Sequence, residues 1–172
     1  MFPLVSFEEV SRAATNRCLS AWNHKMGPLE RGNESGTHFA LMHHGEPVAI
    51  CSQSTLIAPA VGGGMGHLTR DNTCELSRLC AIRPHLCRVA LRLWREFVFP
   101  ALGFQYAMSY QDADLHNGAT YRFDGWTRND KIAHSGIDTR SGRPGRNKWI
   151  WVWERPRVET QSLPAIAEAD SE

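Results

Sequence analysis

One short segment carries a phenol that can act as an acid. Residues 117–126 read NGATYRFDGW, and a short helix is expected over residues 117–123. Tyr121 lies on that helix and is followed by Gly125 and Trp126, which predicts a phenol near the mouth of a site. A phenol in such a position can protonate a departing thiolate. The simpler alternative is that Tyr121 is a half-buried packing residue.

A second feature is the junction between an expected strand and an expected helix. Residues 74–82 form an apolar run that predicts a buried strand, and Pro84 follows at the start of a helix, where its missing N–H is tolerated. Unpaired N–H groups and the helix dipole make such a start an anion site. Arg83 and Arg88 lie beside it, so a pyrophosphate would fit there. An ordinary strand–helix turn is an equal alternative.

Charged side chains interrupt the buried strand. Arg78 can orient a carboxylate or phosphate through paired hydrogen bonds, and Glu75 or Asp112 can accept a proton. Backbone N–H groups around residues 80–82 can stabilise developing negative charge. A structural ion pair between Glu75 and Arg78 is the alternative.

The periodicity of the chain predicts the elements that hold these residues. Ser6 and Glu9 form a capping-box pattern that predicts the start of the first helix. The expected helices are 7–24, 84–99 and 117–123, and the expected strands are 38–42, 48–53, 74–82, 104–110 and 149–153. Trp149, Trp151 and Trp153 alternate along the last strand and are expected to share one buried face. The order predicts a mixed α+β domain over residues 1–157, followed by an acidic tail over 158–172 without fixed structure.

Composition narrows the protein class. The chain has 172 residues, of which 42% are hydrophobic and 22% charged, which predicts one folded domain and excludes a mostly disordered chain. No stretch approaches the roughly 18 apolar residues of a membrane span, and residues 1–9 lack the pattern of a signal peptide. The cysteines are five in number and have no C-x-x-C spacing, so we expect reduced, mostly buried thiols in a cytosol and no membrane partner.

Charge is concentrated near the C-terminal end. Residues 122–157 hold nine basic and four acidic side chains, whereas the whole chain carries a net charge of +1. A local basic surplus indicates a polyanion or a phosphate-bearing cofactor as a partner, and a solvated basic face is the alternative. Arg140, Arg143 and Arg146 lie in a Gly/Pro-rich loop and are the candidates for contact with the phosphates of such a partner.

These motifs together resemble the GNAT superfamily of acyltransferases over residues 36–154. Asn117, Tyr121, Gly125 and Trp126 match its N-x-x-x-Y-x-x-x-G-F segment, with Trp in place of Phe. The resemblance implies a mostly antiparallel central sheet with helices on both faces, and splayed strands that form the cleft for acyl-CoA or a related activated donor. One departure is that the usual R/Q-x-x-G-x-G/A turn is replaced by RPHLCRVA, which has no glycine. The implied donor-binding residues are Ala81, Ile82, Arg83, Arg88, Val89, Ala90 and Asn117.

A narrower resemblance is to the phage Mom group, GNAT-like proteins that modify the exocyclic amine of adenine in phage DNA and protect it from restriction. It rests on ELSRL at 75–79, SYQD at 109–112 and HNGATY at 116–121. It implies DNA as a partner and the cytoplasm of a bacterial host as the location. Arg78 and the loop arginines would contact the substrate, and the implied catalytic residues are Tyr121, Asp112, Glu75 and Ser109.

Other functions stay open at this point. A GNAT N-acetyltransferase would use acetyl-CoA on a protein, an amino acid or a small amine. A binding module would keep the fold without the chemistry. Two histidines and a carboxylate can hold a non-haem iron, and His116 lies near Asp112, but the spacing predicts no ligand set.

Overall fold

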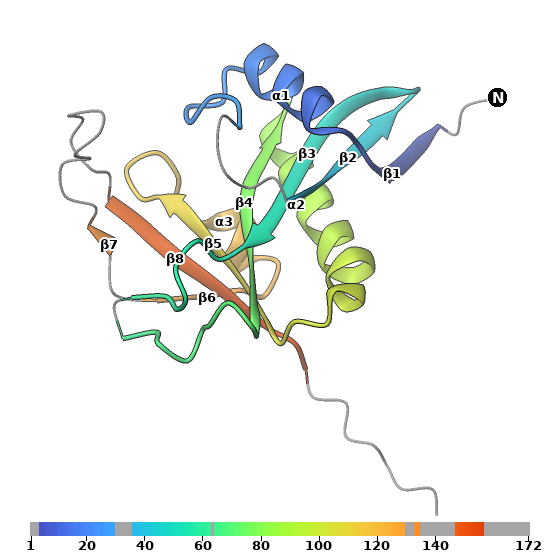
Figure 1. Ribbon diagram of the computed structural model, residues 1–172. Coiled ribbons are helices and arrows are strands. Elements are labelled where there is room, and N and C mark those ends of the chain that lie inside the picture. The colour runs from blue at the N-terminus through green and yellow to red at the C-terminus, as the bar shows by residue number, and fades with distance from the viewer. Residues whose placement is uncertain (1–3, 30–35, 63, 130–132, 135–146, 157–172) are drawn as a thin grey trace, which may run out of the picture.

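The computed structural model describes residues 4–29, 36–62, 64–129, 133–134 and 147–156, and these contain one mixed sheet with helices packed on it (Figure 1). The strands are β1 (Val5–Glu9), β2 (Thr37–His43), β3 (Glu46–Thr55), β4 (Thr73–Ala81), β5 (Tyr106–Asp112), β6 (Thr127–Arg128), β7 (Ala133–His134) and β8 (Asn147–Glu154). Their order across the sheet is β1-β2-β3-β4-β5-β8-β6, and β7 also pairs with β8. Neighbours are antiparallel except β4 and β5, which are parallel.

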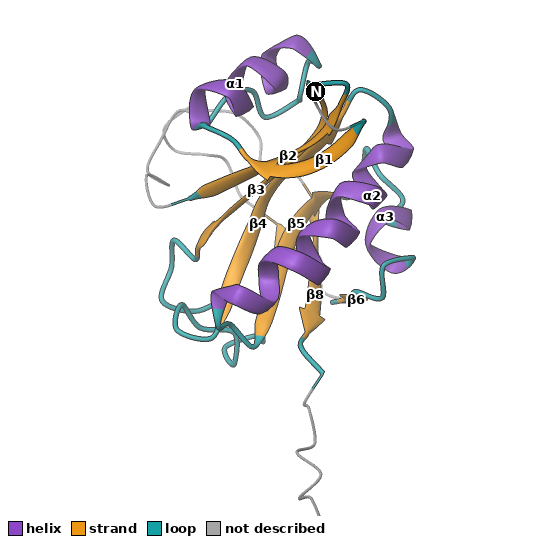
Figure 2. Ribbon diagram, turned by 90° about the vertical axis from the view of Figure 1, so that its right-hand side faces the viewer, coloured by secondary structure: helices purple, strands orange, loops and turns teal. Residues whose placement is uncertain are grey.

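Helices cover both faces of the sheet because successive strand residues point to opposite sides. In β3, Ile50 packs in a cluster with Leu19 of α1 (Arg12–Ala21), whereas Cys51 packs in a cluster with Leu91 of α2 (Pro84–Leu93). The short helix α3 (Ala119–Arg122) lies on the same side as α2 (Figure 2). The predicted α+β class, with a mostly antiparallel sheet covered on both faces, is therefore confirmed.

The second predicted helix is longer and less regular than a single α-helix. After Leu93 the chain makes one π-helical segment, Trp94–Val98, and then a short 3₁₀ segment, Phe99–Leu102, which contains Pro100. The Trp94 ring is fully buried and donates its N–H to Gln53 Oε1 of β3 at 2.5 Å. The π-helical segment therefore begins at a ring that is anchored to the sheet.

The predicted first helix, residues 7–24, is wrong in its first part. Residues 5–9 form β1, which pairs with β2, and the Phe7 ring stacks on Phe39 with centroids 5.8 Å apart. The helix begins after Ser11, whose side chain accepts the N–H of Ala14 at 3.2 Å. Ser6 and Glu9 therefore do not cap it, because a long-range strand pairing overrides the local capping pattern.

Other local predictions are confirmed. The hairpin of β2 and β3 turns through His44 and Gly45, both with positive φ, and all five cysteines are free thiols. Trp151 is buried, and its neighbours Trp149 and Trp153 on the same face are half-buried. Among the described residues, no helix is long and apolar enough to cross a membrane.

Two glycines with the same backbone angle test how tightly the chain packs before α3. Gly118 and Gly103 both have φ +76°, but a Cβ on Gly118 would lie 2.3 Å from Trp151 Cζ2, whereas nothing lies within 4 Å at Gly103. We expect Gly103→Ala to cost about 1 kcal/mol of unfolding free energy from backbone strain alone. Gly118→Ala should cost roughly 2 kcal/mol more because the added methyl collides with a buried ring. Urea unfolding of both variants measures the difference, and equal losses would contradict the close packing.

Candidate active site

The site begins where two neighbouring strands separate. β4 and β5 pair only through Thr73–Glu75 and Tyr106–Met108, although β4 continues to Ala81 and β5 to Asp112 (Figure 1). Beyond that point β4 stays paired with β3, and β5 stays paired with β8. The two facing strand edges therefore open into a wedge, whose backbone groups have no partner strand.

A bulge in β4 lies beside the opening of the wedge. Ser52 of β3 faces Arg78 and Gln53 faces Leu76, so Ser77 is an extra residue in β4. Such an insertion bends a strand and increases its twist. The hydroxyl of Ser77 donates to the Ser52 carbonyl at 3.2 Å, which holds the bulge in place. The sequence analysis did not predict this bulge.

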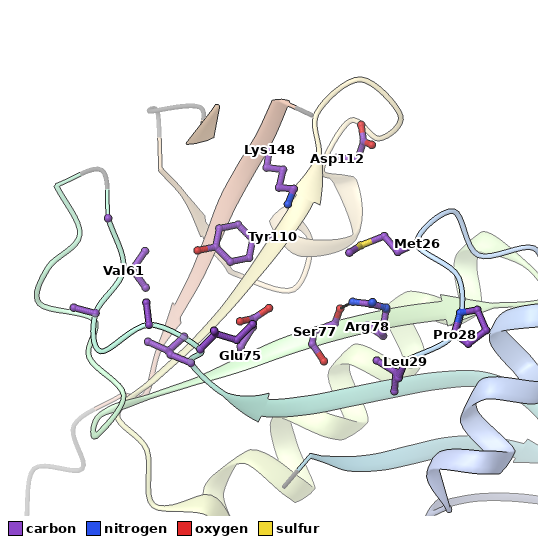
Figure 3. A pocket seen from close by; sticks show the side chains of 15 residues that line it. Met26, Pro28, Leu29, Val61, Glu75, Ser77, Arg78, Tyr110, Asp112 and Lys148 are labelled. Carbon is purple, nitrogen blue, oxygen red and sulfur yellow. Dashed lines mark hydrogen bonds between the residues drawn. The ribbon is translucent and has the colours of Figure 1, made fainter. Parts of the chain in front are cut away.

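Two cavities adjoin in the wedge. The first, which we call the α2-side cavity, has a volume of about 710 Å³ and is bounded by β4, β5, α2 and α3. The second, the loop-side cavity, has a volume of about 630 Å³ and is bounded by β4, β5, Lys148 of β8 and residues 56–62 (Figure 3). Residues that line both cavities are Met26, Ser77, Arg78, Tyr110 and Asp112.

Tyr121 lines the α2-side cavity but is only 6% exposed. Its ring stacks on Trp151 with centroids 5.5 Å apart, and its hydroxyl lies 2.8 Å from Ser109 Oγ. Ser109 gives its single hydrogen to the Leu76 carbonyl at 2.8 Å, so the phenol is the donor in the bond with Ser109. Burial raises the pKa of Tyr121 well above its usual range, which keeps the phenol protonated and able to act as an acid.

A buried carboxylate anchors the segment that carries Tyr121. Asp124 accepts hydrogen bonds from Arg92 Nε at 2.5 Å, Arg95 Nε at 2.7 Å and Trp126 Nε1 at 3.0 Å. This network ties the chain after α3 to the last turn of α2 and to the π-helical segment Trp94–Val98. Sequence reasoning missed the roles of Asp124, Arg92 and Arg95, although a carboxylate in an otherwise aromatic segment was the available signal.

Glu75 and Arg78 lie on the side of the loop-side cavity, as Figure 3 shows. Burial raises the pKa of the Glu75 carboxyl, and the nearby charges of Arg78 and Lys148 partly offset this. In the part of the chain that the structure describes, Glu75 and Arg78 form no ion pair within 4.0 Å. Arg78 instead donates from Nη1 to the Ser77 carbonyl at 2.8 Å, and burial lowers its pKa.

The structure divides the predicted donor-binding residues. Ala81, Arg88 and Asn117 line the α2-side cavity, whereas Ile82, Arg83, Val89 and Ala90 do not. Ala90 is fully buried in the core beneath α2, and its position past the first turn commits its N–H to the helix. The donor-binding role that the resemblance implies for Ala90 is therefore wrong, because its amide is not free to meet a phosphate.

The turn before α2 offers an anion few backbone donors. The N–H of Ile82 is given to the Val48 carbonyl at 3.0 Å and that of Leu86 to the Arg83 carbonyl at 3.1 Å. Pro84 has no N–H. The turn, which lacks the glycines of the usual GNAT motif, therefore has few free backbone N–H groups that could bind phosphates.

The other predicted site residues have different outcomes. Ser109 is the partner of Tyr121, and Asp112 lines both cavities. Arg140, Arg143 and Arg146 lie outside the described residues. Among the described residues, no group of three or more His, Cys, Asp or Glu side chains is placed to hold a metal ion.

Comparisons with known proteins assign the fold to the GNAT acetyltransferases. The ribosomal-protein-S18-alanine N-acetyltransferase from Escherichia coli superposes with a TM-score of 0.61 at 14% identity, covering 92% of this chain and 99% of that one. A variant of the spermidine N-acetyltransferase SpeG from Vibrio cholerae gives 0.59 at 9% identity, covering 88% and 94%. A probable GNAT-family acetyltransferase from Chromobacterium violaceum gives 0.56 at 14% identity, covering 90% and 89%.

The chain therefore has the GNAT fold, as the sequence predicts. No protein-family model matches the sequence, and no curated protein matches it significantly. Nothing in the comparisons supports the narrower resemblance to the Mom group.

The hydrogen-bond chain from Tyr121 through Ser109 to Leu76 can be tested by stability. Ser109→Ala should lower the free energy of unfolding by about 1–3 kcal/mol, because it leaves a buried phenol and a buried carbonyl without their partner. Ser77→Ala is the matched control, since it removes a single serine–carbonyl bond at a less buried position. Urea unfolding gives both values, and a loss at Ser109 no larger than at Ser77 would argue against the chain.

Proposed function

We propose that the protein transfers an acyl group from a thioester donor, acyl-CoA or a related compound, to an amine. The donor would occupy the α2-side cavity and the amine the loop-side cavity. The observation that carries this proposal is that the two cavities adjoin in the wedge between β4 and β5, with Tyr121 lining one and Glu75 the other. The GNAT fold and its acetyltransferase neighbours agree with it.

The facing edge of β4 supports binding of an extended donor arm. Beyond Glu75 this edge has no partner strand, and its N–H and C=O groups can pair with an extended amide-containing chain as a further strand would. Leu79, Cys80 and Ala81 line the α2-side cavity along this edge. When bound, an acyl-CoA would supply an activated thioester carbonyl.

Glu75 is the proposed base. Its raised pKa makes the ionised carboxylate a better proton acceptor than an ordinary exposed glutamate. As the amine nitrogen forms its bond to the acyl carbon, an N–H proton passes to this carboxylate. Asp112, which lines both cavities, is the alternative acceptor.

Tyr121 is the proposed acid. The phenol stays protonated because burial raises its pKa. When the carbon–sulfur bond breaks, its hydrogen turns from Ser109 Oγ to the departing thiolate, and the phenolate recovers a proton from water afterwards. The proton lost by the amine and the proton gained by sulfur are thus handled by different groups on the two sides of the wedge.

Glu75→Gln and Tyr121→Phe test these roles. With acetyl-CoA and a set of primary amines, we expect thiol release by each variant to fall by about 10²–10⁴-fold in kcat/KM. Tyr106→Phe, which alters a β5 tyrosine outside both cavities, should retain activity. The acid limb of the wild-type pH profile should lie above the usual glutamate range, because the pKa of Glu75 is raised.

Stability separates a catalytic loss from misfolding. A raised folded-state pKa means that Glu75 contributes stability at low pH that is lost as pH rises through that pKa. Glu75→Gln should therefore be as stable as the wild type or more so at pH 8, with the advantage shrinking toward pH 4. Unchanged activity in either Glu75→Gln or Tyr121→Phe rules out the role assigned to that residue.

The exocyclic amine of adenine in DNA is a second candidate acceptor. The three segments that carry the resemblance to the Mom group, 75–79, 109–112 and 116–121, all contribute residues to the lining of the two cavities. Such an amine is a weak nucleophile because its lone pair is delocalised into the ring, so it needs a positioned base. The base would have to leave the duplex to reach the wedge. Arg140, Arg143 and Arg146 are the candidates that the sequence offers for phosphate contact.

Nucleoside analysis distinguishes the two acceptors. Mass spectrometry of DNA from cells that express the protein should show an adenine adduct if DNA is the substrate, and Tyr121→Phe should reduce it. If the DNA is unmodified and the purified protein acylates small amines, DNA is ruled out as the substrate and the proposed transferase function is retained.

A further inference from the structure

We propose that Arg88, held against the ring of Phe123, binds the phosphate groups of the donor in place of a backbone amide cradle. This inference rests on the proposed function, because it concerns the donor in the α2-side cavity. Both side chains line that cavity, Arg88 from the second turn of α2 and Phe123 from the chain just after α3. Together they bridge two elements at its edge.

The geometry of the pair leaves the guanidinium available to an anion. The Arg88 guanidinium carbon lies 5.0 Å from the centroid of the Phe123 ring, which is a cation–π contact. A guanidinium that lies over a ring keeps its N–H groups in the plane, where they can bind two phosphate oxygens side by side. Among the described residues, the ion pairs within 4.0 Å do not include Arg88.

Phe123 has no other evident reason to be exposed. Its side chain is 63% exposed, which is unusual for a phenylalanine between the buried residues Tyr121 and Asp124. The contact with Arg88 accounts for its place, since an aromatic face orients a long, flexible cation that would otherwise sample many rotamers. Phe123 is thus a positioning residue, and Arg88 touches the donor.

The turn before α2 explains why a side chain would take this role. Of the five residues from Ile82 to Leu86, two give their N–H to protein carbonyls and Pro84 has none. The first turn of α2 also contains no acidic residue that would compete with a phosphate for the arginine.

A comparison of CoA binding with pantetheine binding isolates the contribution of the phosphates. Both molecules contain the pantetheine arm, but only CoA carries phosphate groups. By isothermal titration calorimetry, Arg88→Gln should lower the affinity for CoA by about tenfold and change the affinity for pantetheine by no more than about twofold. Arg88→Lys should restore only part of the affinity, since an ammonium lacks the paired donors. Phe123→Leu should lower the affinity for CoA by about threefold, whereas Phe123→Tyr, which keeps an aromatic ring, should leave it unchanged.

The matched control is Arg17→Gln, which removes the same charge from an exposed position on α1 outside the cavities. CoA affinity should fall with added salt in the wild type, and less steeply in Arg88→Gln. Equal losses for CoA and pantetheine, or an Arg88→Gln protein that binds CoA normally, overturn the proposal. If the protein uses pantetheine thioesters as donors but does not bind CoA, the phosphate role of Arg88 is ruled out and the proposed transferase function is kept. If neither compound binds, both proposals are ruled out.

Discussion

The early end of the β4–β5 pairing is the constraint on which the site depends. The ladder stops at Glu75 and Met108, while each strand keeps its other partner. The two backbones therefore cannot collapse onto each other, yet the polar groups on their facing edges need partners. Ser109 satisfies one of them, the Leu76 carbonyl. The sheet leaves the remaining edge unpaired, and this is the edge to which we assign the donor.

Several contacts hold the wedge in shape and set its chemistry. The bulge at Ser77 bends β4 next to the last ladder pair, and Asp124 fixes the chain after α3 through Arg95 and Trp126. The Asp124 and Arg95 side chains are only 4% and 11% exposed, so this is a buried, hydrogen-bonded charge pair and not a surface contact. Tyr121 stands on this frame on one side of the wedge, whereas Glu75 stands on the other. The proposed acid and the proposed base thus line different cavities.

Local patterns in the sequence predict the hairpin, the strand before Pro84, the helix that starts there and the short helix of Tyr121, because each has its own periodicity or turn residues. They fail at residues 5–9, where pairing with β2 outweighs a capping pattern. The role that the family resemblance implies for Ala90 fails because the helix uses its amide. Glu75 and Arg78 stand out in sequence because charges are rare in buried strands, and Asp112 stands out through the SYQD segment. All three line the cavities. The bulge, the Asp124 network and the assignment of Glu75 and Tyr121 to different cavities depend on contacts between segments far apart in sequence, which no local pattern encodes.

The central claim is that the wedge receives the donor along the unpaired edge of β4. Backbone amide chemical shifts, recorded by two-dimensional NMR without and with saturating CoA, test it most directly. The account predicts the largest changes at residues 79–81, Arg88 and Phe123, with little change in β1 and β2 on the far side of the sheet. Changes confined to β1 and β2, with residues 79–81 unmoved, would contradict it.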